Sequence, residues 1–180
     1  TCRLPAKRPD KTPAMTMPEP RERRDAPGVI NLADEAATAE LAKTVASVSR
    51  PGDVIALWGD LGAGKTRLVQ GIAQGLDTDD NPRSPTFVLV NRHVGRLVLH
   101  HCDLYRLNSA EEVENLGLME LAEQGDVLAV EWPERGGGVF PSDSLSVHMK
   151  RGTNDNERSI SFTGDGPNCR VLVEAMNAMV

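Results

Sequence analysis

Aromatic side chains are scarce in this 180-residue chain, at 3% of its residues. Proteins that hold single-stranded nucleic acid stack its bases on aromatic rings, so this scarcity argues against that class of function. The formal net charge of −6 argues in addition against a surface that binds the phosphate backbone of nucleic acid as a whole. Only a local basic patch stays compatible with these numbers, so nucleic acid is expected to be contacted at most indirectly.

Cysteine is also sparse, and Cys2, Cys102 and Cys169 are widely spaced with no Cys-x-x-Cys pair. An odd number at such spacing predicts neither a zinc site nor a disulfide framework, and it is typical of a reducing compartment. No apolar run approaches the roughly 18 residues that a membrane-spanning helix needs. The first residues also lack the apolar stretch of a secretory signal. We therefore expect a cytoplasmic protein that does not bind a membrane.

Residues 1–27 differ in composition from the rest, because prolines recur there and Arg and Lys outnumber Asp and Glu. Almost nothing in this stretch can pack into a core, so we expect a disordered tail. Two alternatives stay open: an over-long start with Met15 or Met17 as the true initiator, and a basic tail that touches RNA. Residues 28–180 have the length of a single domain.

Hydrophobic periodicity and turn residues divide the remainder into alternating strands and helices. Residues 53–58 form a continuous apolar run between turn residues, which is typical of a strand buried on both faces. Such alternation predicts an α/β sandwich with a central, largely parallel sheet and a C-terminal β-hairpin. Strands are expected over residues 29–32, 53–58, 87–90, 97–102, 127–130, 145–150 and 159–163, and helices over 34–49, 65–74 (capped by Gly75), 111–124 (interrupted near Gly117) and 171–179.

A glycine-rich turn follows the buried strand and carries the strongest functional signal. Residues 59–66 read GDLGAGKT and fit the pattern G-x-x-x-x-G-K-[ST] between a strand and a helix. In such a loop the backbone N–H groups around Gly62, Ala63 and Gly64 approach the β-phosphate of a nucleotide, aided by the positive end of the helix dipole. The Lys65 ammonium bridges the β- and γ-phosphates, and the Thr66 hydroxyl binds Mg²⁺. The sequence therefore predicts a site for ATP with magnesium.

Two acidic residues follow predicted strands and are candidates for the metal or the attacking water. Asp103 comes after the strand at 97–102, and Glu131 comes after the strand at 127–130. A P-loop site needs a carboxylate at the end of a neighbouring strand, although a solvated carboxylate is also common there. His100 and His101 are interpreted as packed or capping residues rather than catalysts. Trp132 is interpreted as a core residue, or alternatively as a ring near the nucleotide or a partner.

Four short motifs occur in a fixed order: GDLGAGKT at 59–66, SPTF at 84–87, HCDLYRL at 101–107 and VEWPER at 130–135. Together they resemble the TsaE family, formerly YjeE, the ATPase component of bacterial threonylcarbamoyladenosine synthesis. The resemblance spans about residues 29–163. It implies a P-loop α/β fold and work with the TsaB–TsaD complex, which attaches a threonylcarbamoyl group to the adenosine next to the anticodon in tRNAs reading codons that begin with A. ATP turnover in the family resets that complex between rounds.

The resemblance also implies roles for single residues. Lys65 and Thr66 serve the phosphates and Mg²⁺, Glu131 is the carboxylate at the metal, and Asp103 supports hydrolysis. Residues 84–86 resemble a switch that senses the γ-phosphate. The adenine pocket of the family is implied near residues 34–35, with a further residue among 156–158.

This chain departs from the family at two positions. Arg67 stands where a second Thr is usual, which removes a hydroxyl from the α-phosphate and offers a guanidinium to a phosphate or a partner instead. Cys102 replaces a common aromatic residue and is interpreted as a small buried hydrophobe.

Three functions remain open on these grounds. The first is a slow ATPase that acts on a protein complex, weak alone because no arginine finger is identifiable. The second is a small-molecule kinase, although Arg92, Arg96 and Arg106 do not form a recognisable lid. The third is a nucleotide-gated binding module whose hydrolysis is incidental, with residues 84–86 ordered by ATP.

Overall fold

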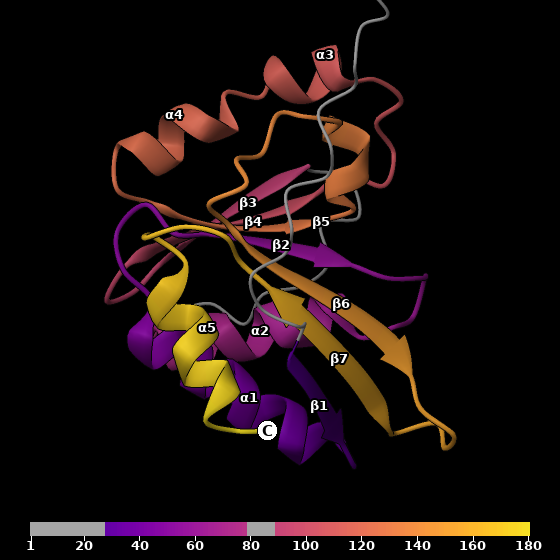
Figure 1. Cartoon of the computed structure of the whole chain (residues 1–180). Helices are drawn as coiled ribbons and strands as arrows, with labels where there is room; N and C mark the ends of the chain where they lie inside the picture. The colour runs from indigo at the N-terminus through magenta and orange to yellow at the C-terminus, as the bar shows by residue number, and fades with distance from the viewer. Residues whose placement is uncertain (1–27, 79–88) are drawn as a thin grey trace, which may run out of the picture.

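Seven strands form one mixed sheet in the computed structural model, which describes residues 28–78 and 89–180 (Figure 1). The helices are α1 (Glu35–Val48), α2 (Lys65–Gly75), α3 (Ala110–Glu114), α4 (Leu118–Glu123) and α5 (Arg170–Asn177), with a 3₁₀ turn η1 (Pro133–Gly136). The strands are β1 (Gly28–Leu32), β2 (Val54–Trp58), β3 (Val90–Val94), β4 (Val98–Asp103), β5 (Val127–Glu131), β6 (Leu145–Arg151) and β7 (Arg158–Thr163). The switch-like segment at 84–87 and the predicted tail at 1–27 lie outside the described residues.

The strand order is β1-β7-β6-β2-β5-β4-β3. The four central strands, β6, β2, β5 and β4, are parallel to one another. The outer strands β1, β7 and β3 pair antiparallel with their neighbours. Apolar runs therefore sit in the centre, where both faces are covered, while more polar strands occupy the edges. The predicted parallel centre and the hairpin of β6 and β7 are confirmed.

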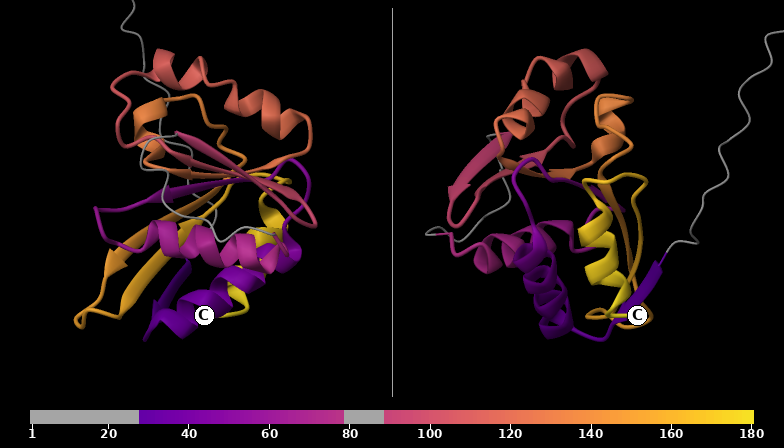
Figure 2. Two further views of the ribbon diagram at one scale, coloured as in Figure 1. Left: turned by 180° about the vertical axis from the view of Figure 1, so that it is seen from behind. Right: turned by 60° about the vertical axis from the view of Figure 1, so that its left-hand side comes forward.

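Helices cover both faces of the sheet and enclose two hydrophobic cores. α1, α2 and α5 lie on one face, and α3, α4 and η1 lie on the other, as the views from two further directions show (Figure 2). Successive residues of β2 point alternately into the two cores: Ile55 and Leu57 face α1 and α2, whereas Val54 faces α3 and α4. Within the described residues, no helix is long and apolar enough to cross a bilayer.

Two small residues on α2 allow it to lie close against α1. A Cβ at Gly71 would come within 2.5 Å of the Ala42 methyl, and a Cβ at Gly75 within 2.6 Å of the Ala46 methyl. The prediction that Gly75 caps this helix is wrong by one residue, because the helix includes Gly75 and Leu76 is its C-cap; the close approach of Ala46 explains why a glycine stands at position 75. Asp77, with φ 56°, takes the left-handed position just beyond the helix end.

The strand predicted at 87–90 is displaced in the structure. β3 begins at Val90 and runs on through the polar residues to Val94, and residues 87–88 lie outside the described part of the chain. The strand was predicted at 87–90 because these four residues are all apolar. An edge strand, however, has one unpaired side and accommodates polar residues such as Asn91 and Arg92. The turn η1 has no counterpart among the predicted elements.

Candidate functional site

The glycine loop leaves the end of β2 and runs directly into α2. Gly64 has φ 103°, a left-handed conformation that a side chain would strain, and Lys65 is the first residue of the helix. The first N–H groups of a helix have no partners within the helix, so they face whatever lies beyond its N-terminus. The strand–loop–helix context that the motif requires is present, and it directs these amides and the helix dipole toward an anion.

The Lys65 side chain is buried and held by the loop itself. It is 4% exposed, and its Nζ donates hydrogen bonds to the carbonyl oxygens of Gly59 at 2.6 Å and Asp60 at 3.1 Å. Burial lowers the pKa of this ammonium from its ordinary value, and the carboxylate of Glu131 opposes the shift. The ammonium is thus partly stripped of water before any ligand arrives, which strengthens its attraction for an anion.

A tryptophan covers the same ammonium. Lys65 Nζ lies 3.8 Å from the centroid of the Trp132 ring, a cation–π arrangement. Trp132 has φ 60°, a conformation that costs a non-glycine residue about 1 kcal/mol or more. Tyr105 packs against its ring with centroids 4.9 Å apart. Trp132 thus packs partly against the core on the α3 and α4 side and also covers the ammonium of the loop lysine, while its predicted alternative role near a nucleotide or a partner stays a prediction.

Glu131, the last residue of β5, contacts the start of α2. One of its oxygens, Oε1, accepts a hydrogen bond from the Thr66 hydroxyl at 2.8 Å and lies 2.8 Å from His101 Nε2. Glu131 is 3% exposed, so this carboxylate is almost wholly enclosed. A hydroxyl that donates its hydrogen to a carboxylate keeps its oxygen lone pairs available for a cation. Thr66 and Glu131 together therefore offer oxygen atoms of the kind that Mg²⁺ prefers.

Asp103 stands beside Glu131 at the end of the next strand. The two residues are partners in the register of β4 and β5, so their side chains leave the same face of the sheet. Asp103 Oδ1 accepts a hydrogen bond from the backbone N–H of Tyr105 at 3.1 Å. Its second oxygen, Oδ2, makes no hydrogen bond within the described residues. The two carboxylates predicted from the strand ends are thus brought together at one edge.

Nearly all of the predicted site residues line one cleft, of about 350 Å³, which we call the loop cleft. It is lined by Leu61, Gly62, Gly64, Lys65, Thr66, Arg67, Gln70, Asp103, Tyr105, Glu131 and Trp132. Ala63 is the exception, because its methyl group packs in the core and its N–H donates to the Asp60 carbonyl at 3.1 Å. That amide already supports the turn of the loop, so the prediction that Ala63 binds the ligand gains no support from the geometry.

A second hollow, the side pocket, adjoins the loop cleft at Gly64 and Arg67. It is lined by Glu35, Thr38, Gly64, Arg67, Met149, Asn156 and Arg158. Glu35 and the segment 156–158, which the family resemblance implicated separately in adenine binding, therefore meet around one space. Asp34 has a different role, because its carboxylate caps α1 by accepting from the Ala37 N–H at 2.8 Å.

Arg67 lies at the border between these two spaces. Its guanidinium pairs with the Glu35 carboxylate at 2.5 Å and also reaches the Gln70 side chain at 3.4 Å. Both partners of the ion pair are more than half exposed, so its contribution to stability is small. Arg67 is therefore placed to contact a ligand that spans the loop cleft and the side pocket.

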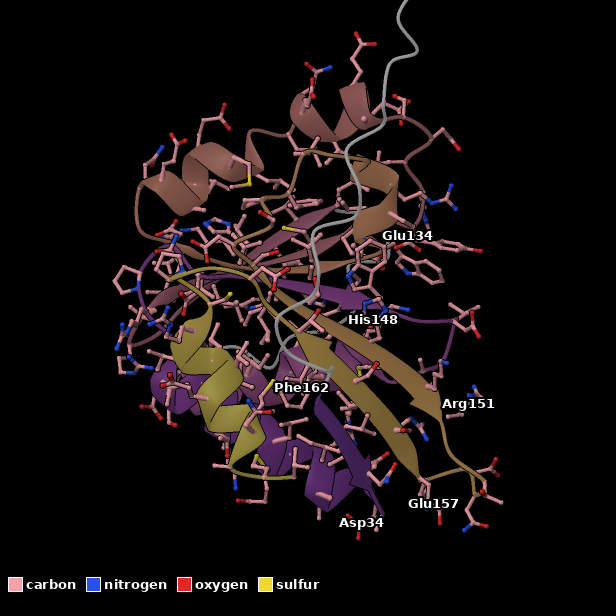
Figure 3. All side chains as sticks on the ribbon, in the orientation of Figure 1. Asp34, Glu134, His148, Arg151, Glu157 and Phe162 are labelled. Atoms are coloured by element: carbon pink, nitrogen blue, oxygen red, sulfur yellow. The ribbon has the colours of Figure 1, made fainter. Side chains whose placement is uncertain are left out.

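Sequence reasoning missed three residues at this site. His101 contacts Glu131, Tyr105 packs on Trp132, and Arg151 at the end of β6 donates from Nε to the Gly62 carbonyl at 3.2 Å. Figure 3 labels Arg151 on the hairpin and Glu134 on the turn after β5. His101 was detectable in principle, because it precedes Asp103 by two positions on a strand and so shares its face. No local pattern linked Arg151 to the loop.

The donor set fits magnesium better than a metal held by the protein alone. In residues 28–78 and 89–180, no group of three or more His, Cys, Asp or Glu side chains could hold a metal ion. Mg²⁺ in nucleotide sites is bound through one or two protein oxygens together with substrate phosphates, so a larger cluster is not required. Cys102 is fully buried, and burial raises the pKa of its thiol to about 12, as expected for a small hydrophobe.

The sheet, the layered helices and the glycine loop define the class of protein: a P-loop NTPase-like fold. The crystal structure of Bacillus subtilis YdiB matches it with a TM-score of 0.70 and 32% identity, covering 85% of this chain and 96% of that one. A model of the family described as threonylcarbamoyl adenosine biosynthesis protein TsaE matches residues 32–160. The chain therefore belongs to the TsaE family, which confirms the resemblance carried by the four motifs.

Curated relatives agree with this assignment. The tRNA threonylcarbamoyladenosine biosynthesis protein TsaE of Bacillus subtilis is 39% identical over 141 residues, which cover 78% of this chain and 87% of that protein. The Synechocystis protein of the same name is 46% identical over 110 residues, covering 58% and 69% of the two chains.

Proposed function

We propose that this protein is a magnesium-dependent ATPase, slow by itself, that serves the threonylcarbamoyl modification of tRNA. The relatives are named for that pathway, and the observation that carries the proposal is the loop cleft itself. There a phosphate-type loop, a buried lysine and a Thr66–Glu131 pair converge. ATP, Mg²⁺ and the TsaB–TsaD complex are the ligands and the partner that follow from this proposal, and the cytoplasm is its compartment. tRNA is contacted at most through the partner complex.

Phosphate binding follows from the state of Lys65. Its hydrogen bonds to the carbonyls of Gly59 and Asp60 are exchanged in part for charge-assisted bonds to β- and γ-phosphate oxygens, which are stronger. The Trp132 ring above the ammonium excludes water from the same place. A triphosphate thus meets a partly desolvated cation and the amino end of α2 together.

Metal binding follows from Thr66 and Glu131. The Thr66 hydroxyl donates to Glu131, so its oxygen and the Glu131 carboxylate would be the protein groups that hold the cation, directly or through water. Magnesium, when bound, neutralises charge on the β- and γ-phosphates. Asp103, the register partner of Glu131, orients the attacking water through its second oxygen.

Slow turnover follows from the arginines near the site. Three described arginines lie next to the loop, and each already has a partner: Arg67 pairs with Glu35, Arg151 donates to the Gly62 carbonyl, and Arg158 donates to the carbonyls of Asp155 and Glu157. Phosphoryl transfer gains about 10³–10⁵-fold from an arginine on the transferring group, so a site whose arginines are held by other groups is slow. Arg96 donates to the Ala46 carbonyl, remote from the cleft, which disfavours the lid that a small-molecule kinase would need. We expect the TsaB–TsaD complex to supply or order the missing group.

The test combines turnover with capture. ATP hydrolysis is measured for the protein alone and with purified TsaB–TsaD, and the same complex is used to capture the protein with ATP, with ADP and without nucleotide. We expect weak hydrolysis alone, a clear stimulation by the complex and capture that depends on the nucleotide state. Equal rates with and without the complex would count against the partner, and absence of magnesium-dependent ATP binding would overturn the whole proposal.

A further inference from the structure

Two adjacent histidines on β4 point to opposite faces of the sheet and make the same kind of contact. His100 Nε2 lies 2.7 Å from Asp126 Oδ2, and His101 Nε2 lies 2.8 Å from Glu131 Oε1. In each ring Nδ1 is buried without a hydrogen-bond partner among the described residues. Only one of the two carboxylates, that of Glu131, belongs to the loop cleft. His100 can therefore serve as a control for His101: both rings contact a carboxylate, but only His101 contacts one that lines the loop cleft.

The surroundings of His101 decide which of its nitrogens carries the proton. The ring is wholly buried, and Glu131, when ionised, can only accept. A proton on Nε2 therefore completes the contact with Oε1, while a second proton on the buried Nδ1 would have no acceptor among the described residues. His101 thus contacts Glu131 through Nε2, and its wholly buried ring has no surface through which to touch a ligand itself.

Two donors on one oxygen restrict how the Glu131 carboxylate can turn. Thr66 Oγ1 and His101 Nε2 both lie 2.8 Å from Oε1, one from α2 above the sheet and one from the neighbouring strand. Rotation of the carboxylate would break both hydrogen bonds in a nearly dry environment, where an unpaired polar group is costly. Oε2 makes no hydrogen bond within the described residues, so it is the oxygen left for the cleft.

We propose that His101 is a positioning residue that fixes the Glu131 carboxylate, and through it the Thr66 hydroxyl, in the orientation that magnesium requires. The inference rests on the proposed function of the loop cleft and adds to it a residue that touches neither nucleotide nor metal. Partners of this kind, which hold a metal-binding carboxylate, change metal affinity or activity about 10–100-fold when they are removed.

The test uses His101→Leu, which removes the donor, His101→Gln, which returns an N–H near the position of Nε2, and His100→Leu as the matched control. Binding of a fluorescent ATP analogue is measured in EDTA and over a magnesium titration, together with kcat and KM for hydrolysis. For His101→Leu we expect unchanged binding in EDTA, about a tenfold higher magnesium concentration at half-effect and about a tenfold lower kcat. His101→Gln should restore part of the magnesium affinity and part of kcat. His100→Leu lowers thermal stability and leaves the magnesium dependence unaltered.

Other results would distinguish a failure of the proposed function from a failure of the role given to His101. A wild-type protein that binds no nucleotide contradicts the proposed function, whereas normal binding with an identical magnesium response in wild type and His101→Leu overturns the role of His101 alone. An equal change in His100→Leu would also overturn it. Should both His101 variants unfold, the ring ¹⁵N signals of the wild type decide: addition of magnesium to the ATP complex should move those of His101 and not those of His100, and unmoved His101 signals would refute the inference.

Discussion

The two edges of the parallel sheet differ in how their carboxylates are used. At the amino edge, an aspartate precedes each of three strands: Asp53 before β2, Asp126 before β5 and Asp143 before β6. Asp53 accepts from the Arg50 N–H at 2.7 Å, Asp126 contacts His100, and Asp143 accepts from the Asn168 and Cys169 N–H groups at 3.0 and 3.2 Å. Each one ties a chain segment to the start of a strand.

At the carboxyl edge, Glu131 and Asp103 each keep an oxygen that makes no hydrogen bond within the described residues. A hollow of about 350 Å³ is present at both edges, so size does not distinguish them. The difference lies in unused acceptors beside a desolvated cation and a helix N-terminus, which only the carboxyl edge combines. That is the edge at which open α/β sheets bind ligands. Asp53 and Asp126 at the amino edge also each keep one oxygen without a hydrogen bond within the described residues. The comparison therefore teaches that a buried lysine beside free carboxylate oxygens, rather than cavity volume or free oxygens alone, marks the site.

The largest effect is expected from removing the buried ammonium of Lys65, which distinguishes the carboxyl edge from the amino edge. Lys65→Ala removes the ammonium to which the proposed function assigns the triphosphate, and we expect ATP·Mg affinity to fall by about a hundredfold, as for the loss of charge-assisted hydrogen bonds. Titration calorimetry measures the affinity, with Lys150→Ala as the control, because Lys150 is an exposed lysine on β6. Unchanged affinity would mean that the carboxyl edge is no phosphate site.

Neutralising Glu131 should separate binding from hydrolysis. In Glu131→Gln the amide oxygen can still accept from Thr66 and His101, so ATP binding should stay within a few-fold of wild type. Turnover should fall about a hundredfold, within the range of a positioned acid–base or electrostatic group. Both are measured on the same preparation, and the variant is then added to a reconstituted tRNA modification assay. Full support of modification there would favour a nucleotide-gated binding module over an ATPase.

Asp103→Asn should have a smaller effect of the same kind. Its side-chain oxygen can still accept from the Tyr105 N–H, so the local turn is retained. Because the variant loses the charge that we propose orients the attacking water, we expect turnover to fall about tenfold with ATP affinity unaltered. Parallel measurements of kcat and of binding in EDTA check this. If the variant instead abolished binding, the role given to Asp103 would be wrong.

The smallest effect is expected at the amino edge. Burial raises the pKa of the Asp53 carboxyl, so its contribution to stability is present below the unfolded-state pKa of about 3.9 and is lost as pH rises through the higher folded-state value. Asp53→Asn should therefore raise the free energy of unfolding slightly at pH 7 and leave it unchanged near pH 3. Thermal unfolding at both pH values tests this. A change in ATP affinity would contradict the contrast between the edges.

Much of the scaffold was predictable because its signals are local. The run at 53–58, the helix after the loop and the hairpin each follow from a period of two or 3.6, or from turn residues next to each other in the chain. Two predictions failed where partners elsewhere in the chain matter. Gly75 is a glycine because it packs against the Ala46 methyl on another helix, not because it caps its own helix, and β3 pairs on one side only, as an edge strand.

What the sequence by itself determined is the phosphate loop, the two strand-end carboxylates and the family, since each is written in consecutive residues. Only the tertiary structure decided that Thr66 and His101 share one oxygen of Glu131, and that Arg151 reaches Gly62. The physical reason is that contacts between residues dozens of positions apart depend on strand order and register. Those come from the packing of the whole sheet between its two helical layers, and no local period encodes them.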